Sequence, residues 1–244
     1  AGDMAFPIVE TTNNGTTADG TSHTVNLPTG IVSGNLLLAM FSLSTPATAT
    51  WPAGWTELYD TASAGTLMGS GAYRVADGGE GASITVTTSI GGEGSYNTYR
   101  ISGQHASSAP EVGTSATGSS TTPDPPAVTP TWGSADTLWF AVMHHDFCTV
   151  TTAPTNYTNL LAQDGATPVT ASARRALAAA DENPGGFTVS AADAWVAQTC
   201  AVRPAEAGGA TTKRLLTLGL GSVVPLWPAW WRYQRQRRRH AHHP

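Results

Sequence analysis

The sequence predicts an all-β fold, in the form of a jelly-roll-like β-sandwich followed by a C-terminal extension, and three observations support this. Only 12% of the 244 residues are charged, and the abundant Thr, Val, Tyr and Trp side chains pack well on pleated strands. Short apolar runs recur between turns rich in Gly, Pro, Asn and Ser, as in sandwiches and jelly rolls. The chain also repeats itself at a long period.

Each strand expected in the first half is an apolar or alternating run that ends at a turn signal. In Ile84–Thr87 the apolar side chains fall on one face of an extended chain. Gly34-Asn35 precedes a fully apolar run and indicates a turn leading into a buried strand. The strands expected here are His23–Leu27, Leu36–Leu43, Thr56–Tyr59, Gly71–Ala76, Ser83–Thr88 and Ser95–Ile101.

Two turns of the first half have clear signals. Pro52-Ala53-Gly54 predicts a tight turn that directs Trp55 into the core or onto a surface. Asp77–Gly81 contains three glycines, which permit positive φ angles, and it predicts a hairpin loop.

The second half shows the same kind of pattern after a turn-rich stretch. Ala171–Ala180 is rich in alanine and is the one plausible helix, but its position in the repeat favours a strand. The strands expected here are Leu138–His144, Thr158–Ala162, Ala171–Ala179, Phe187–Ser190 and Trp195–Val202.

The repeat has a period of about 102 residues. Pro52–Leu58 matches Pro154–Leu160 in its Pro, aromatic, Thr and Leu positions, and Ser33–Met40 matches Ser134–Ala141. We expect one sandwich over residues 1–205, with two small sandwiches as the alternative. The expected parts are the pseudo-repeats 6–103 and 127–204, and a Ser/Thr/Pro/Gly-rich connector from Gln104 to Pro130.

Four segments together carry a resemblance to a known family: Leu27–Leu38, Trp51–Thr56, Ala72–Gly78 and Tyr99–Gly103. Their pattern resembles β-sandwich proteins of tailed-phage and prophage structural modules, which serve as fibre, decoration or adhesion components. The resemblance covers residues 6–205. It implies a sandwich with a structural role, and it offers no catalytic residue to carry over.

Charge divides the chain into two parts. Residues 1–212 hold all 17 acidic residues and five arginines, a net charge of −12, whereas residues 213–244 hold seven basic residues and no acid. An acidic body with a basic end suggests that the two parts face different partners. We interpret residues 206–212 as a linker and 213–244 as a basic, Trp-rich docking tail.

His144-His145-Asp146 is the most reactive-looking cluster. Neighbouring residues of a strand point to opposite faces, so the two histidines cannot ligate one metal, and we expect a histidine pair in a loop at a strand end. No GxSxG, HExxH, P-loop or paired-carboxylate motif is present. We therefore expect no enzyme activity, cofactor or metal site, with calcium at turn carboxylates as an open alternative.

Aromatic side chains are expected mainly to pack in the core, with a sugar-stacking platform as the alternative. Those concerned are Trp51, Trp55, Tyr59, Tyr73, Tyr96, Tyr99, Trp132, Tyr157 and Trp195.

The tail combines an apolar and a basic segment. Leu215–Trp231 has no charge, but a membrane helix needs about 20 apolar residues, and Pro225 and Pro228 would break a helix here. We therefore favour docking into a neighbouring subunit over a membrane or sorting segment, because large aromatic and Arg side chains dominate interface energetics. The expected docking residues are Trp227, Trp230, Trp231, Arg232, Tyr233, Arg235, Arg237, Arg238 and Arg239.

Together these patterns predict a non-enzymatic virion structural protein of a tailed phage, made in the host cytoplasm. It would serve as a capsid decoration, head fibre or tail fibre that contacts other virion proteins and a host-surface glycan. We expect a homo-oligomer, with a trimer as one option, and no nucleic-acid or membrane partner. The alternative is a bacterial surface carbohydrate-binding or adhesion module held by a C-terminal membrane or sorting segment.

Overall fold

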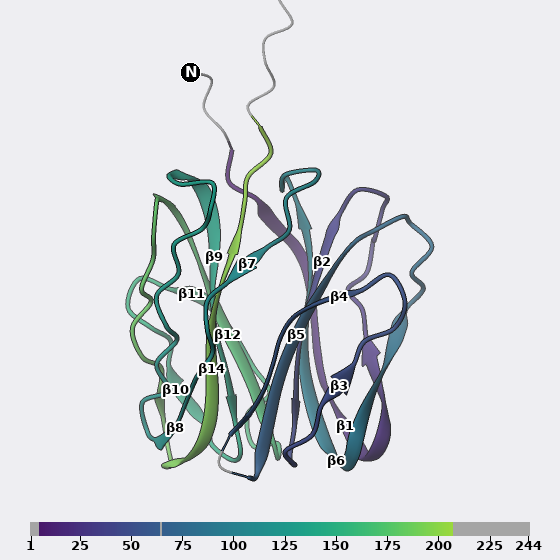
Figure 1. The fold of residues 1–244 in the computed structure, drawn as a ribbon, viewed down its shortest axis with the longest axis vertical. Helices are drawn as coiled ribbons and strands as arrows, with labels where there is room; N and C mark the ends of the chain where they lie inside the picture. The colour runs from purple at the N-terminus through teal and green to yellow at the C-terminus, as the bar shows by residue number, and fades with distance from the viewer. Residues whose placement is uncertain (1–4, 64, 207–244) are drawn as a thin grey trace, which may run out of the picture. The chain divides into compact units, whose positions relative to one another are not determined.

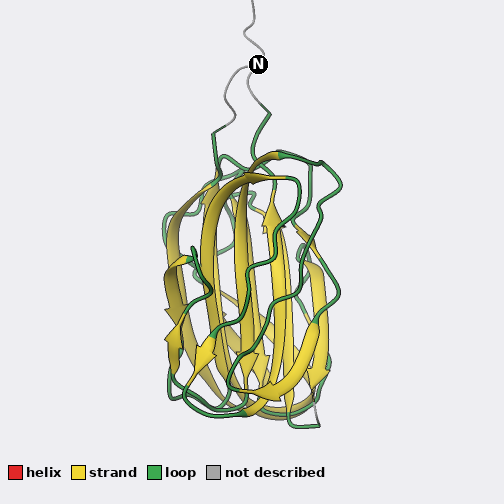
Figure 2. Ribbon diagram, turned by 90° about the vertical axis from the view of Figure 1, so that its left-hand side faces the viewer, coloured by secondary structure: helices red, strands yellow, loops and turns green. Residues whose placement is uncertain are grey.

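The computed structural model describes residues 5–63 and 65–206, and every regular element in these ranges is a β-strand. The strands form two six-stranded antiparallel sheets that pack face to face (Figure 1), and Figure 2 shows only strands and loops. The all-β sandwich prediction is confirmed. Within these ranges no helix has the length and apolarity needed to cross a membrane.

Sheet one takes all its strands from the first half of the chain. Its order is β1-β6-β2-β5-β4, and β3 pairs with β6 outside this path. The bounds are β1 (Ile8–Asn26), β2 (Leu36–Leu43), β3 (Ala49–Thr50), β4 (Thr56–Ser63), β5 (Leu67–Val75) and β6 (Ser83–Ser102).

Sheet two takes all its strands from the second half. Its order is β11-β12-β9-β14-β7, β8 also pairs with β14, and β10 pairs separately with β13. The bounds are β7 (Glu111–Val112), β8 (Ala116–Ser120), β9 (Ala135–His145), β10 (Val150–Thr152), β11 (Thr158–Ala162), β12 (Val169–Ala179), β13 (Thr188–Val189) and β14 (Asp193–Val202).

The two sheets repeat one topology. In sheet one β2 lies between β5 and β6, and in sheet two β9 lies between β12 and β14. The strands β2, β5 and β6 therefore correspond to β9, β12 and β14. The register agrees, because Leu36 pairs with Ile101 and Leu138 pairs with Val202. Each repeat in the sequence therefore builds one sheet of a shared sandwich.

The segment predicted as a connector, Gln104 to Pro130, takes part in sheet two. It contains β7 and β8, and Val128 forms a bridge with Glu182. The strands of the second repeat thus begin at Glu111, before the expected start at residue 127. This segment consists of short polar runs and prolines, so its strands lack the apolar runs on which the strand predictions depended.

β1 and β6 form a long ribbon that the sequence predicted only in part. Polar residues make up most of the first half of β1, and the two strands expected at 83–88 and 95–101 are one strand, β6. The pairing is irregular between Thr17 and Ser22, where the ribbon turns back over sheet one (Figure 1). The Thr98 hydroxyl accordingly donates to Asn26 O at 2.9 Å, across the fold of the ribbon.

Apolar side chains fill both faces of the central strands. All eight residues of β2 are buried, which agrees with its unbroken apolar sequence. Leu38, Met40, Phe140 and Val142 lie between the sheets. Phe41 lies under the folded ribbon on the outer face of sheet one.

The chain enters and leaves the sandwich at the same end (Figure 1). Ala205 N donates to Gly103 O at 2.7 Å, Gln104 forms a bridge with Pro204, and Gly103 lies beside Pro7. We call this the proximal end. The opposite, distal end carries the bend of the β1–β6 ribbon and the β11–β12 turn.

Candidate functional site

His144 and His145 lie within β9 rather than in a loop, and both are fully buried. They point to opposite faces, as expected. His144 faces sheet one, where its Nδ1 lies 2.6 Å from the Ser42 hydroxyl and its Nε2 lies 2.9 Å from the Tyr59 hydroxyl. Burial lowers the pKa of His144 to about 3, so the ring is neutral at pH 7.

Two glycines of β5 make room for this histidine. A methyl group on Gly69 would overlap the His144 ring, and one on Gly71 would overlap the Tyr59 ring. A Ser–His pair is one that nucleophilic catalysis uses, but no part of Ser42 or His144 reaches solvent. The group therefore joins the sheets instead of meeting a substrate.

Further hydrogen bonds extend this polar layer between the sheets. Thr170 on β12 bonds Ser42 at 2.6 Å and Ser95 at 2.8 Å, with both bonds between hydroxyls. Ser172, also on β12, bonds the Tyr99 hydroxyl at 2.6 Å and accepts from Asn97 Nδ2 at 2.9 Å. Each bond links a strand of sheet one to a strand of sheet two, so the layer fixes their register.

His145 faces the other way, under the outer cover of sheet two. Both of its ring nitrogens are buried and have no hydrogen-bond partner among the described residues. Burial is the main cause that lowers its pKa. The residue is fully buried, so we interpret it as part of the core.

The aromatic residues divide into two groups. Tyr59, Tyr96, Tyr99, Tyr157 and Trp195 are buried, which confirms their interpretation as core residues. Tyr73 and Trp132 are partly buried and pack against core clusters. Trp51 and Trp55 are also only partly buried and stack with their ring centroids 5.8 Å apart. Trp51 Nε1 donates to Ser70 Oγ at 3.0 Å, so the pair covers the outer face of sheet one.

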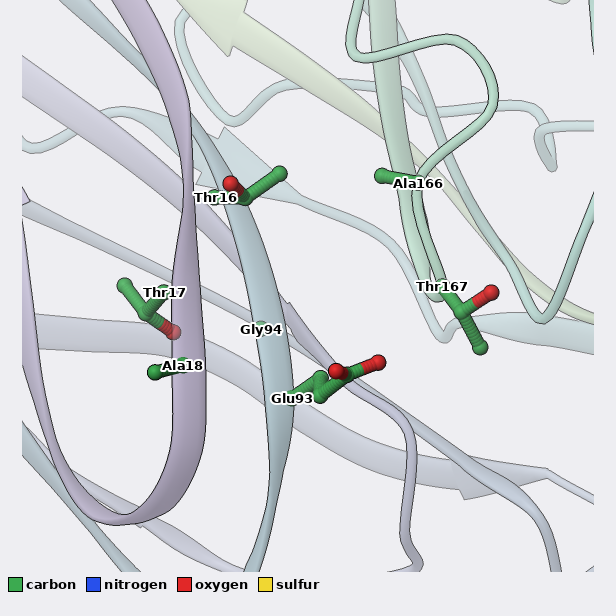
Figure 3. A pocket seen from close by; sticks show the side chains of 7 residues that line it. All are labelled: Thr16, Thr17, Ala18, Glu93, Gly94, Ala166 and Thr167. Carbon is green, nitrogen blue, oxygen red and sulfur yellow. The ribbon is translucent and has the colours of Figure 1, made fainter.

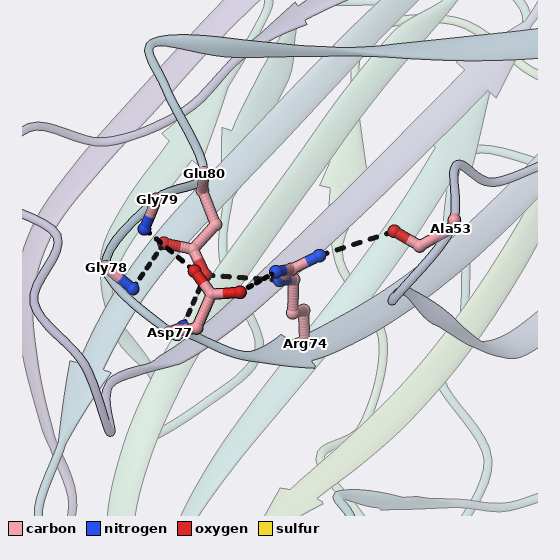
Figure 4. A network of polar contacts seen from close by, with 6 residues as sticks. All are labelled: Ala53, Arg74, Asp77, Gly78, Gly79 and Glu80. Carbon is pink, nitrogen blue, oxygen red and sulfur yellow. Dashed lines mark hydrogen bonds and ion pairs between the residues drawn. The ribbon is translucent and has the colours of Figure 1, made fainter.

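The loop Asp77–Gly81 is not a hairpin, because it joins β5 to β6, and β2 lies between these strands in the sheet. Arg74 organises the loop by contacting Asp77 at 2.6 Å and Glu80 at 3.1 Å (Figure 4). The Glu80 carboxylate accepts from Asp77 N at 2.6 Å and Gly78 N at 3.1 Å. The carboxylates of Asp77 and Glu80 are thus occupied by contacts within the protein, and we interpret the loop as structural.

A groove of about 390 Å³ lies at the distal end, between the two sheets. Sheet one contributes Thr16 to Ala18 from β1 and Glu93 and Gly94 from β6, and sheet two contributes the β11–β12 turn (Figure 3). In Figure 3 the Glu93 side chain points from β6 toward the β11–β12 turn, which carries Thr167 on the opposite side of the groove. The residues that line the groove are Thr16, Thr17, Ala18, Glu93, Gly94, Ala166 and Thr167.

The groove carries one negative charge and no positive charge in its lining. Glu93, Thr16 and Thr167 are exposed, which leaves their oxygens accessible to a ligand. These residues were not predicted from the sequence. They stand far apart in the chain in turn-like segments, and no local pattern joins them.

Within residues 5–63 and 65–206, no three His, Cys, Asp or Glu side chains are placed to hold a metal ion. Cys148 and Cys200 are buried free thiols, and burial raises the pKa of each to about 12. The predicted docking tail, residues 213–244, lies outside the described residues, and so do its expected docking residues from Trp227 to Arg239.

Comparison of the chain with protein-family models, with curated proteins and with solved structures found no match.

Proposed function

We propose that this chain is a non-catalytic structural protein of a tailed-phage particle, displayed on the head or tail with its sandwich facing outward. The observation that carries the proposal is that the chain leaves the sandwich at the proximal end, where it also enters. There Ala205 and Gly103 form a hydrogen bond of 2.7 Å. A body held at its proximal end presents the distal end to its surroundings. The resemblance of residues 6–205 to phage sandwich proteins supports the same role.

The interior of the sandwich suits a display body. The polar layer at Ser42, His144 and Thr170 lies between two apolar sheets, and each of its bonds is made in a buried setting. Buried hydrogen-bond networks of this kind favour one unique packing. A host-contact body needs such a fixed shape more than it needs moving parts.

We assign the attachment of the protein to the particle to its C-terminal segment, because of the sequence of that segment. Trp227, Trp230 and Trp231 would enter pockets of a neighbouring subunit, and the five arginines that follow would pair with acidic surface. The acidic body of a sister copy, with a net charge of −12 over residues 1–212, is one such surface. This favours a homo-oligomer.

Removal of residues 213–244 tests the assignment. The truncated chain should melt cooperatively like the full chain, because its strands lie within residues 8–202, but it should no longer co-sediment with particles. Replacing Trp227, Trp230 and Trp231 by Ala should have the same effect. Thr211→Ala with Thr212→Ala is the control and should leave incorporation unchanged. Normal incorporation of the truncated chain would reject the docking tail.

A bacterial surface carbohydrate-binding module is the second candidate, because Trp51 and Trp55 form a partly exposed stack. Under this alternative the full chain would fractionate with cell envelopes, and Trp55→Ala would remove its glycan binding. Under the first, the chain would fractionate with particles.

A further inference from the structure

We propose that the distal groove binds a neutral saccharide through Glu93, Thr16 and Thr167. The choice of this ligand class rests on the proposed display function. The groove lies at the distal end of the sandwich, between the ribbon of sheet one and the β11–β12 turn of sheet two. Its volume of about 390 Å³ falls within the range of small-molecule sites, roughly 300–1,000 Å³.

The walls of the groove are held in place before any ligand arrives. Asn14 on β1 donates to Gln163 Oε1 at 3.0 Å and so ties sheet one to the start of the β11–β12 turn. Glu93 is fixed by its backbone, because its N–H donates to Ser44 Oγ at 3.0 Å and its carbonyl accepts from Ser44 N at 3.0 Å. Preorganised walls lower the entropic cost of binding.

The lining determines which groups a ligand must offer. The Glu93 carboxylate only accepts hydrogen bonds, whereas the Thr16 and Thr167 hydroxyls both donate and accept. A ligand with several hydroxyls matches this set, since each hydroxyl can donate to the carboxylate and exchange bonds with a threonine. Ala18, Ala166 and the threonine methyl groups supply apolar contacts for the C–H faces of a sugar ring.

Charge excludes the main competing ligands. Anionic ligands, such as nucleic acid or acidic glycans, meet Glu93 with no Lys, Arg or His in the lining, and residues 1–212 have a net charge of −12. A cation would find only one carboxylate and no aromatic face among the lining residues. A neutral polyol satisfies every polar group without bringing a charge.

The test is a titration of the full chain by saturation-transfer NMR and calorimetry. The probes are neutral mono- and disaccharides of glucose, galactose, mannose and N-acetylglucosamine, with glucuronate and putrescine as the anionic and cationic arms. We expect a neutral saccharide to bind. Glu93→Gln should weaken it about tenfold, because a bond to a charged acceptor is lost, and Thr167→Val should weaken it as well.

Glu10→Gln is the matched control, since Glu10 is an exposed acid near the proximal end that contacts Ser102. It should leave binding unchanged within twofold, and melting curves should show all three variants folded. No saccharide binding, equal binding by Glu93→Gln, or preference for putrescine or glucuronate would overturn the inference. Particle co-sedimentation of the same variants reports separately on the display function, because Glu93→Gln should still be incorporated.

Discussion

The His144 imidazole lies between the two sheets and bonds both Ser42 and Tyr59. As a neutral ring it can donate with one nitrogen and accept with the other, which a protonated ring cannot do. Its buried position therefore favours the neutral form. The folded protein holds the pKa of His144 at about 3, against an ordinary value of 6.5.

Stability should consequently fall in acid. Between pH 6.5 and 3, His144 is protonated in the unfolded chain but neutral in the folded chain. The contribution of His144 to the free energy of unfolding is therefore largest above pH 6.5 and decreases as the pH falls below this value. The expected slope from this residue is about 1.4 kcal/mol per pH unit. Urea unfolding at pH 7, 6, 5 and 4 measures it. His144→Gln should remove that part of the slope, and identical slopes would contradict the prediction.

The close approach of β5 to this ring gives a second residue-scale prediction. Gly69→Ala places a methyl group against the His144 ring and should cost about 1–3 kcal/mol, the usual range for overpacking. The control is Gly91→Ala, whose new methyl group would meet only ordinary contacts at 3.6 Å and beyond. If both variants unfold at the same urea concentration, the packing beside Gly69 accepts a methyl group and the prediction is wrong.

At the scale of elements, the connection from β5 to β6 depends on one ion pair. Arg74 and Glu80 lie 3.1 Å apart, and only 1% of the Glu80 side chain is exposed, compared with 68% for Asp77. Without its charged partner, the buried Glu80 carboxylate would keep only the hydrogen bonds from the backbone N–H groups of Asp77 and Gly78. The loop carries the chain from sheet one to the ribbon that covers its outer face.

Arg74→Ala should therefore destabilise the protein by about 3 kcal/mol, as measured by urea unfolding. Asp77→Asn should have a smaller effect, since Asp77 is largely exposed and its contact with Arg74 is screened by solvent. Adding Glu80→Gln to Arg74→Ala should restore part of the loss by removing the stranded charge. A double variant less stable than Arg74→Ala would refute the ion-pair explanation.

At the scale of the molecule, the sandwich is an interface between two repeats. Strands of residues 8–102 form sheet one, and strands of residues 111–202 form sheet two and the separate β10–β13 pair, with no strand exchanged in the described ranges. The interface holds both an apolar cluster around Leu38, Phe140 and Val142 and the polar layer at His144. Such a surface should hold the halves together without a peptide link.

Cleavage between the repeats tests this expectation. A protease site inserted between the exposed residues Ala106 and Ser107 should allow cutting without loss of fold, and both fragments should elute together in gel filtration. After cutting, the unfolding midpoint should rise with protein concentration, because folding now includes association. The uncut insertion variant should show no such dependence. Separate elution of folded halves would contradict the prediction.

The sequence alone determined the strands whose signal is local. The apolar run at 36–43 gave strand bounds that agree with β2, because a strand buried on both faces needs apolar side chains whatever its partners. The bounds expected at 158–162 agree with β11, an edge strand whose residues are exposed or partly buried. The repeat also resolved the alanine-rich segment at 171–179 as a strand, now β12.

Only the tertiary structure decided the rest. The polar first half of β1 is a strand because β6, some 80 to 90 residues later, supplies its hydrogen bonds, and His144 is structural because Ser42 and Tyr59 enclose it. The distal groove likewise joins residues 16–18, 93–94 and 166–167. Local patterns report what a segment buries, whereas pairing and enclosure depend on distant residues that only the folded chain brings together.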